Sequence, residues 1–244
     1  MNTYRKNAII AGVLWIAATV VPILGMVVIQ YIQHIDAPDY LVTVAANANQ
    51  VKTGALFELV YAFASASIAI WLYPVLKKHD EALALGSVVF RLIEGILGIV
   101  SVIGLLSLLT LSQEFVKAGA PDASHFQTVG TSIFAGRHWA GMLSGAAFIL
   151  GALMYYYTFY RSKLIPRWLS VWGLIGVPFW IASILLRMFG VIEGFSTSAI
   201  LFDLLIMVNE MVLAVWLIVK GFDSSAIASL NAKTDKNAHA HGGF

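Results

Sequence analysis

Six stretches of the sequence are apolar over more than twenty residues, and this feature restricts the fold more than any other. A bilayer core is about 30 Å thick and a helix rises about 1.5 Å per residue, so one crossing needs roughly 20 apolar residues. The stretches cover residues 7–30, 53–76, 82–113, 133–160, 166–192 and 197–222. We therefore predict an all-α integral membrane protein in which residues 1–222 form a bundle of six transmembrane helices.

The composition excludes several classes of protein. Of the 244 residues, 59% are hydrophobic and only 11% are charged, whereas soluble domains carry roughly 25% charged residues. A soluble enzyme is therefore excluded, and the lipid bilayer is the expected partner. The net charge of +2 offers no basic patch for nucleic acid. Because the chain has no cysteine, disulfides, thiolate metal sites and cysteine nucleophiles are excluded as well.

The distribution of basic residues predicts the orientation. If both termini are cytoplasmic, only Lys52 and Lys117 lie on the outer side. The inner side then holds Arg5, Lys6, Lys77, Lys78, Arg161, Lys163, Arg167, Lys220, Lys233 and Lys236. This bias follows the positive-inside rule. An aromatic belt is expected at the same inner interface, formed by Trp71, Tyr73, Tyr155, Tyr156, Tyr157, Tyr160, Trp168 and Trp172.

The two long outer connections and the C-terminal tail differ from the spans. Residues 31–52 and 114–132 could each hold a short interfacial helix, capped by Asp36 or Asp122. Residues 223–244 are polar and small, so we expect a disordered cytoplasmic tail.

Several motifs resemble one known family. They are Ile10-Ala11-Gly12-Val13-Leu14, Phe90-Arg91-Leu92-Ile93-Glu94, the segment Tyr160-Arg161-Ser162-Lys163-Leu164-Ile165-Pro166-Arg167-Trp168-Leu169, Asn209-Glu210, and Trp216-Leu217-Ile218-Val219-Lys220-Gly221. In this order and spacing, the chain resembles a bacterial multi-pass membrane family known as domain of unknown function 4386. The resemblance implies a helical membrane protein and carries over no activity and no catalytic residue.

Ionisable residues inside the predicted spans are the candidate functional groups. They are Glu58, Arg91, Glu94, Arg137, His138, Arg187, Asp203 and Glu210. A charged side chain at the centre of a membrane helix costs roughly 2.5–3.5 kcal/mol on insertion scales. These groups must therefore face the bundle interior and pair, or lie in a wet cavity.

The positions along the spans predict two polar layers. Glu58, Arg137, His138, Arg187 and Asp203 lie near the outer end of their helices, and Tyr61 shares a helix face with Glu58. Arg91, Glu94 and Glu210 lie deeper. A polar and small stripe along the third span indicates that its charges point inward; its members are Ser87, Arg91, Glu94, Gly98 and Ser101. We expect the two layers to form one connected polar interior.

The deeper layer has two interpretations. Arg91 with Glu94 or Glu210 could be an interhelical salt bridge that fixes helix register. Alternatively, two glutamates that share one arginine in a low dielectric favour keeping one carboxyl protonated, which would make a titratable proton site.

The outer layer could bind a ligand. His138, Glu58 and Asp203 have the chemistry of metal ligands. Metal sites without sulfur usually contain more than one histidine, however, and two nearby arginines would repel a cation. The same arginines suit an anionic group, or they simply pair with the two acids. We predict no metal and no cofactor.

Three classes of function remain open. We favour binding or translocation of a small or protonic solute through the charged interior, in a bacterial inner membrane. An accessory or assembly protein with purely structural charges is the alternative, and a membrane-embedded enzyme is the third. Other protein partners cannot be predicted from the sequence.

Overall fold

A computed structural model describes residues 2–29, 37, 39–119, 123–193 and 196–241. The described residues form helices and connecting turns. The helices are α1 (Thr3–Val28), α2 (Tyr40–Ala46), α3 (Ala48–Leu76), α4 (Glu81–Lys117), α5 (Ala123–Ser162), α6 (Arg167–Met188), α7 (Thr197–Val219) and α8 (Ser224–His241). Six of them are long and apolar enough to cross a membrane. The prediction of a bundle of six membrane helices is confirmed.

Polar side chains fix where several helices begin. The Asn2 side chain accepts a hydrogen bond from the Tyr4 amide at 3.1 Å, at the start of α1. Asp80 accepts from the Leu83 amide at 3.0 Å before α4, and Ser196 accepts from the Ala199 amide at 3.3 Å before α7. Such caps satisfy amides that have no partner within the helix. By fixing where the next helix begins, such a cap also sets the end of a short connection, such as the one between α3 and α4.

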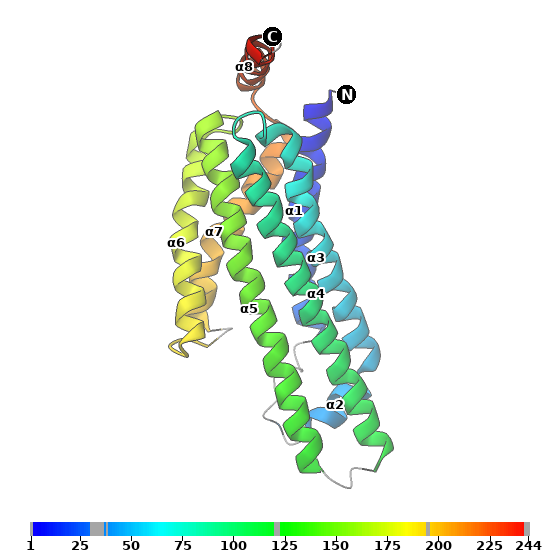
Figure 1. Cartoon of the computed structure of the whole chain (residues 1–244). Coiled ribbons are helices and arrows are strands. Elements are labelled where there is room, and N and C mark those ends of the chain that lie inside the picture. The colour runs from blue at the N-terminus through cyan, green and yellow to red at the C-terminus, as the bar shows by residue number, and fades with distance from the viewer. Residues whose placement is uncertain (1, 30–36, 38, 120–122, 194–195, 242–244) are drawn as a thin grey trace.

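The six long helices pack side by side, and α3, α4 and α5 extend further than the rest (Figure 1). Helix α1 packs against α3 and α7, α4 against α3 and α5, and α6 against α5 and α7. At the end far from the termini, α3, α4 and α5 continue past α6 and α7 and enclose α2 (Figure 1). Two apolar cores result: one is centred on Trp15 and Tyr155, and the other lies around Leu41 and Leu105 beside α2.

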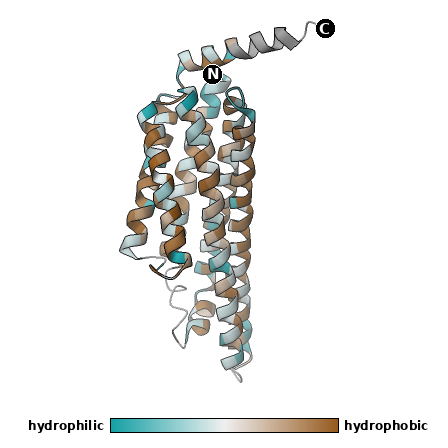
Figure 2. Cartoon of the chain, turned by 60° about the vertical axis from the view of Figure 1, so that its left-hand side comes forward, coloured by the Kyte–Doolittle hydropathy of each residue, from teal (hydrophilic) through white to brown (hydrophobic). Residues whose placement is uncertain are grey.

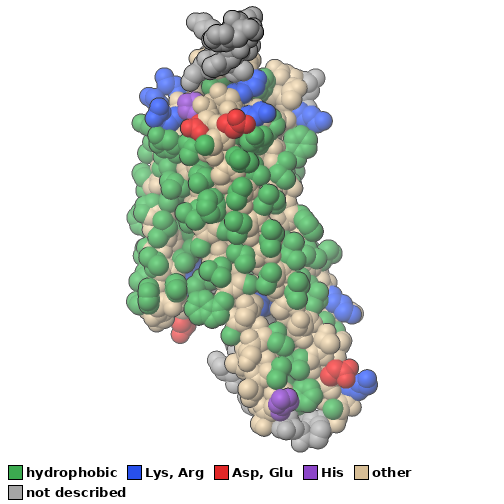
Figure 3. Space-filling model, in the orientation of Figure 1, with side chains coloured by type: hydrophobic (Ala, Val, Ile, Leu, Met, Phe, Trp, Pro, Cys, Tyr) green, Lys and Arg blue, Asp and Glu red, His purple; other side chains and the backbone are tan. Residues whose placement is uncertain are grey.

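The outer surface of the bundle is apolar. Large hydrophobic side chains lie exposed along the spans, among them Phe63, Ile96, Ile103 and Leu201. Figures 2 and 3 show hydrophobic residues over the length of the bundle, with charged residues gathered at its ends. Because water-exposed apolar patches of this extent are unfavourable, this surface is the one in contact with lipid.

One long connection contains the short helix that the sequence predicted, and the other differs from the prediction. The first long connection contains α2, whose Tyr40, Leu41 and Val44 are buried. In the second, α4 and α5 extend through most of the segment, and α5 begins about ten residues before the predicted span. Hydrophobic periodicity does not detect these extensions because they are polar. The proposed caps Asp36 and Asp122 lie outside the described residues.

Within the predicted tail, the described residues Ser224–His241 form helix α8. Helix α8 runs across the end of the bundle near the N-terminus (Figure 2). Its start is capped by Asp223, which accepts from the Ala226 amide at 2.9 Å. Leu230 is buried, and Asn231 accepts hydrogen bonds from Lys78 at 2.8 Å and Tyr4 at 2.7 Å. These few contacts, which the composition does not reveal, anchor the start of the helix.

Candidate functional site

A buried ion pair lies in the middle of the bundle. Arg91 and Glu94 are one turn apart on α4, and the guanidinium Nη1 lies 3.0 Å from the Glu94 Oε2 atom. Both residues are only 1% exposed. The sequence predicted an inward-facing charged stripe, and the burial of Ser87, Arg91, Glu94 and Gly98 confirms its direction. The pair lies within one helix, so Arg91 and Glu94 do not form an interhelical bridge with each other.

Neighbouring helices hold this pair in place. The Tyr61 hydroxyl on α3 donates to Glu94 Oε1 at 2.8 Å, and Arg91 Nε donates to the Ser65 carbonyl at 3.2 Å. From α5, the Ser144 hydroxyl donates to the Glu94 carbonyl at 2.9 Å. The Arg91 guanidinium also lies over the Phe148 ring, 5.2 Å from its centroid. Helices α3 and α5 thus hold Arg91 and Glu94 of α4 in place.

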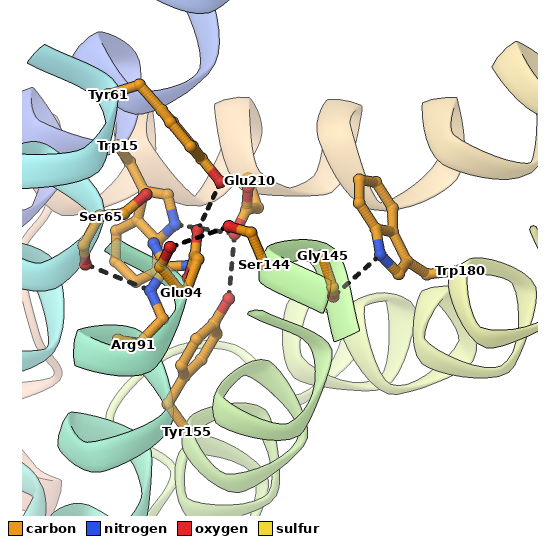
Figure 4. Close-up of polar contacts among 10 residues, drawn as sticks. All are labelled: Trp15, Tyr61, Ser65, Arg91, Glu94, Ser144, Gly145, Tyr155, Trp180 and Glu210. Carbon is orange, nitrogen blue, oxygen red and sulfur yellow. Dashed lines mark hydrogen bonds and ion pairs between the residues drawn. The ribbon is translucent and has the colours of Figure 1, made fainter. Parts of the chain in front are cut away.

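The second carboxylate of the centre comes from α7. Glu210 Oε1 accepts two hydrogen bonds, from the Trp15 indole on α1 and from the Tyr155 hydroxyl on α5, each at 2.9 Å. Glu210 is 8% exposed. Figure 4 shows Glu210 and Glu94 converging in the same region as Arg91. The charge of Arg91 acts on both carboxylates.

We call Arg91, Glu94, Glu210, Tyr61, Trp15 and Tyr155 the central cluster. It draws on five helices: α1, α3, α4, α5 and α7. Its formal charge is −1 if both carboxyls are ionised, because one arginine faces two glutamates. The predicted deeper layer therefore exists as a packed, hydrogen-bonded group.

The outer charges form two separate pairs instead of one layer. Arg137 on α5 holds Glu58 on α3 through two hydrogen bonds, at 2.8 Å and 2.6 Å, and also donates to the Ser101 carbonyl at 2.9 Å. Arg187 on α6 pairs with Asp203 on α7 and donates to the Ser183 hydroxyl at 2.9 Å. The two pairs belong to different parts of the bundle, since α3–α5 and α6–α7 separate at this end (Figure 1).

The prediction of a single connected polar interior was therefore wrong for the outer residues. His138 is exposed on α5 and has an edge contact with the Trp139 ring, 6.1 Å between centroids, rather than a place beside Glu58 and Asp203. Among the described residues, no three His, Asp or Glu side chains are grouped to hold a metal ion. Position along a helix does not determine which neighbouring helix a residue faces.

Sequence reasoning missed two hydrogen-bond donors of the central cluster. Tyr155 was assigned to an interfacial aromatic belt, yet Tyr155 and Tyr156 are fully buried. Trp15 was not considered, although an indole N–H in the middle of an apolar span needs a buried acceptor. A search for an acid that could accept a hydrogen bond from each Tyr or Trp inside the spans would have identified both Trp15 and Tyr155. Exposed Tyr157 and Trp168 remain compatible with the predicted belt.

The outer pair between Arg137 and Glu58 leads to a stability prediction. Arg137→Leu leaves the Glu58 carboxylate, 18% exposed, without its cation. We expect a loss of about 1–3 kcal/mol in the free energy of unfolding, since a largely buried acceptor loses its partners. Thermal unfolding in detergent measures this loss of stability. Lys117→Leu is the matched control, because Lys117 and Glu114 are 78% and 61% exposed and such pairs contribute about 0–1 kcal/mol. Equal losses in both variants would contradict the prediction.

Six long apolar helices around a buried cluster of acids, an arginine and aromatic donors define a multi-pass membrane protein with ionisable groups in its core. Comparison with protein-family models matches residues 10–221 to the family described as "Domain of unknown function (DUF4386)". The chain belongs to this family, and the resemblance stated from its motifs is confirmed. No curated protein and no solved structure matches the chain.

Proposed function

We propose that the protein binds or translocates a small or protonic solute, and that Glu94 and Glu210 are its proton-binding groups. The observation that carries the proposal is the charge balance of the central cluster: two buried carboxyls converge near one arginine, and only Glu94 forms an ion pair with it among the described residues (Figure 4). An unpaired buried charge costs several kcal/mol, so the cluster is more stable when one carboxyl carries a proton.

The other arginines of the spans support this charge balance. Arg137 and Arg187 pair with Glu58 and Asp203, so each outer pair is neutral by itself. Only the central cluster combines an excess of carboxyl groups with nearly complete burial among the pairs described. A proton is the smallest cation that can restore neutrality there.

The geometry also supports a link between protonation and helix packing. Glu94 is held by α3 through Tyr61, and Glu210 is held by α1 and α5 through Trp15 and Tyr155. When a carboxyl gains or loses its proton, the strengths of these interhelical hydrogen bonds change. A solute that prefers one arrangement of the helices would therefore bind in a proton-dependent manner.

The membrane and the orientation are part of the same proposal. Basic side chains gather at the end of the bundle that carries the N-terminus (Figure 3). Several stack on aromatic rings there, with Lys77 5.2 Å from the Tyr73 centroid and Arg167 5.3 Å from that of Tyr160. The positive-inside rule then assigns this end to the cytoplasm. We place the protein in a bacterial inner membrane with both termini inside.

Infrared spectroscopy and proton flux test the proposed site. We expect a protonated-carboxyl band in the wild type near neutral pH that is lost in Glu94→Gln or Glu210→Gln. In liposomes that contain a pH-sensitive dye, both variants should unfold at wild-type temperatures but lose proton flux.

Two controls accompany this experiment. Glu58→Gln changes a paired carboxylate in the membrane, and Glu114→Gln changes an exposed one; neither should remove the band. A wild-type protein without the band, or Gln variants with undiminished flux, would contradict the proposal.

An accessory role is the second candidate. Its support is the pairing of Glu58 with Arg137 and of Asp203 with Arg187, which joins α3 to α5 and α6 to α7. In that case the central cluster would only hold the bundle together, and apolar replacement of its charges would preserve the protein's phenotype.

A further inference from the structure

A groove lies at the basic end of the bundle, between the α5–α6 connection and the α7–α8 connection. Its volume is about 600 Å³. The Asp223 amide donates to the Leu164 carbonyl at 2.9 Å and thereby ties the two connections together. The groove is therefore built by contacts between segments that are about sixty residues apart in the sequence.

Three cations line this groove: Lys163, Arg167 and Lys220. All three are exposed. Among the described residues that line the groove, the one acid is Asp223. It accepts hydrogen bonds from the Ser225 hydroxyl at 2.5 Å and the Ala226 amide at 2.9 Å, which lower its pKa. Its carboxylate is thus engaged with the start of α8. The groove has an excess of two positive charges and suits an anion.

The backbone conformation of Lys163 supports a role for its side chain in the charge of the groove. Its φ is 58°, in the left-handed region. There a residue with a Cβ costs roughly 1–2 kcal/mol more than glycine. Glycine is common at such positions after a helix. The chain carries a lysine at this point, where it adds a cation to the groove.

A second hollow lies beside the first, along α7. Its volume is about 420 Å³, and its wall consists of Met211, Val212, Val215 and Val219. Trp216 and Lys220 line both hollows. Val215 and Val219 are 55% and 62% exposed, so this furrow is open to the surrounding lipid. A cationic groove at the end of the helices thus borders an apolar furrow along α7, with Trp216 and Lys220 common to both.

We propose that this combined groove binds one anionic phospholipid, with its phosphate at Lys163, Arg167 and Lys220 and an acyl chain along α7. Charge complementarity selects the head group. The furrow distinguishes a lipid from a free anion, because inorganic phosphate has nothing to place against four apolar side chains. The site is separate from the central cluster and does not depend on the proposed proton function.

Native mass spectrometry of the full-length protein in mild detergent tests this assignment. Phosphatidylglycerol and phosphatidylcholine with identical acyl chains are added in turn. We expect tighter binding of phosphatidylglycerol. The triple variant Lys163→Gln, Arg167→Gln, Lys220→Gln should weaken that binding by on the order of a hundredfold, because each cation near an anionic head group contributes about a factor of five.

The matched control removes three cations from the same end of the bundle outside the groove. Lys6→Gln, Lys77→Gln and Arg161→Gln together should leave phosphatidylglycerol binding within about twofold of the wild type. Val215→Gln should weaken the binding of both lipids, because it places a polar side chain in the apolar furrow. Equal affinity for the two lipids, or an equal loss in the control triple, would overturn the proposal. Displacement of the lipid by inorganic phosphate at equal concentration would identify a free-anion site and also overturn it.

Discussion

Replacing Arg91 with leucine is expected to destabilise the folded protein by about 3–5 kcal/mol, since it leaves buried carboxyls without their cation. Arg91 is 1% exposed, lies 3.0 Å from Glu94 and acts on Glu210 as well. The guanidinium also donates to the Ser65 carbonyl, so α3 loses a hydrogen bond. Unfolding in detergent, followed by circular dichroism, measures the loss.

The double variant Arg91→Leu, Glu94→Leu should recover most of this stability. Matched apolar replacement of a buried ion pair is often neutral or stabilising, because both desolvation costs disappear together. Glu210 would then remain as a single buried carboxyl held by Trp15 and Tyr155. A double variant as unstable as the single one would mean that Arg91 acts through packing on Phe148 instead of charge compensation.

The same double variant separates the two candidate functions. An accessory protein with structural charges should keep its phenotype once the bundle folds. A proton pathway should lose flux, because Glu94 is gone. Measuring stability and proton flux on one sample therefore distinguishes a folding defect from a functional one.

The sequence predicted the spans and the inward face of α4 because both depend on the spacing of residues along one helix. Bilayer thickness sets helix length, and the spacing of Ser87, Arg91, Glu94 and Gly98 on α4 indicates one face. That face is buried as predicted. These properties are local, so a single sequence contains them.

The contacts of each charged residue with neighbouring helices were not predictable in the same way. His138, Glu58 and Asp203 lie at similar depths, yet Glu58 faces α5, Asp203 faces α6 and His138 is exposed. The order of helices around the bundle decides these contacts, and apolar periodicity does not specify that order. Tyr155 illustrates the same limit: its position near the inner end predicted an interface, whereas its side chain points inward to Glu210.

The central cluster also depends on how closely α3 and α4 approach, and substitution of Gly95 should expose this dependence. A Cβ atom at Gly95 would lie 2.7 Å from the Ala62 carbonyl oxygen and 3.4 Å from the Ala66 methyl group. The first contact is with backbone, which cannot rotate away. Gly95→Leu should therefore push the helices apart and cost about 1–3 kcal/mol.

This separation would act directly on the site, because Gly95 follows Glu94 and Ala62 follows Tyr61. The 2.8 Å hydrogen bond between Tyr61 and Glu94 should lengthen, so proton flux should fall together with stability. Gly141→Leu is the matched control: Gly141 is exposed on α5, and a Cβ there meets nothing within 4 Å. It should be neutral or stabilising by up to about 1 kcal/mol, since glycine is a poor helix former. Equal stability of the two variants would show that the α3–α4 contact tolerates a side chain, and that the geometry of the cluster does not rest on this glycine.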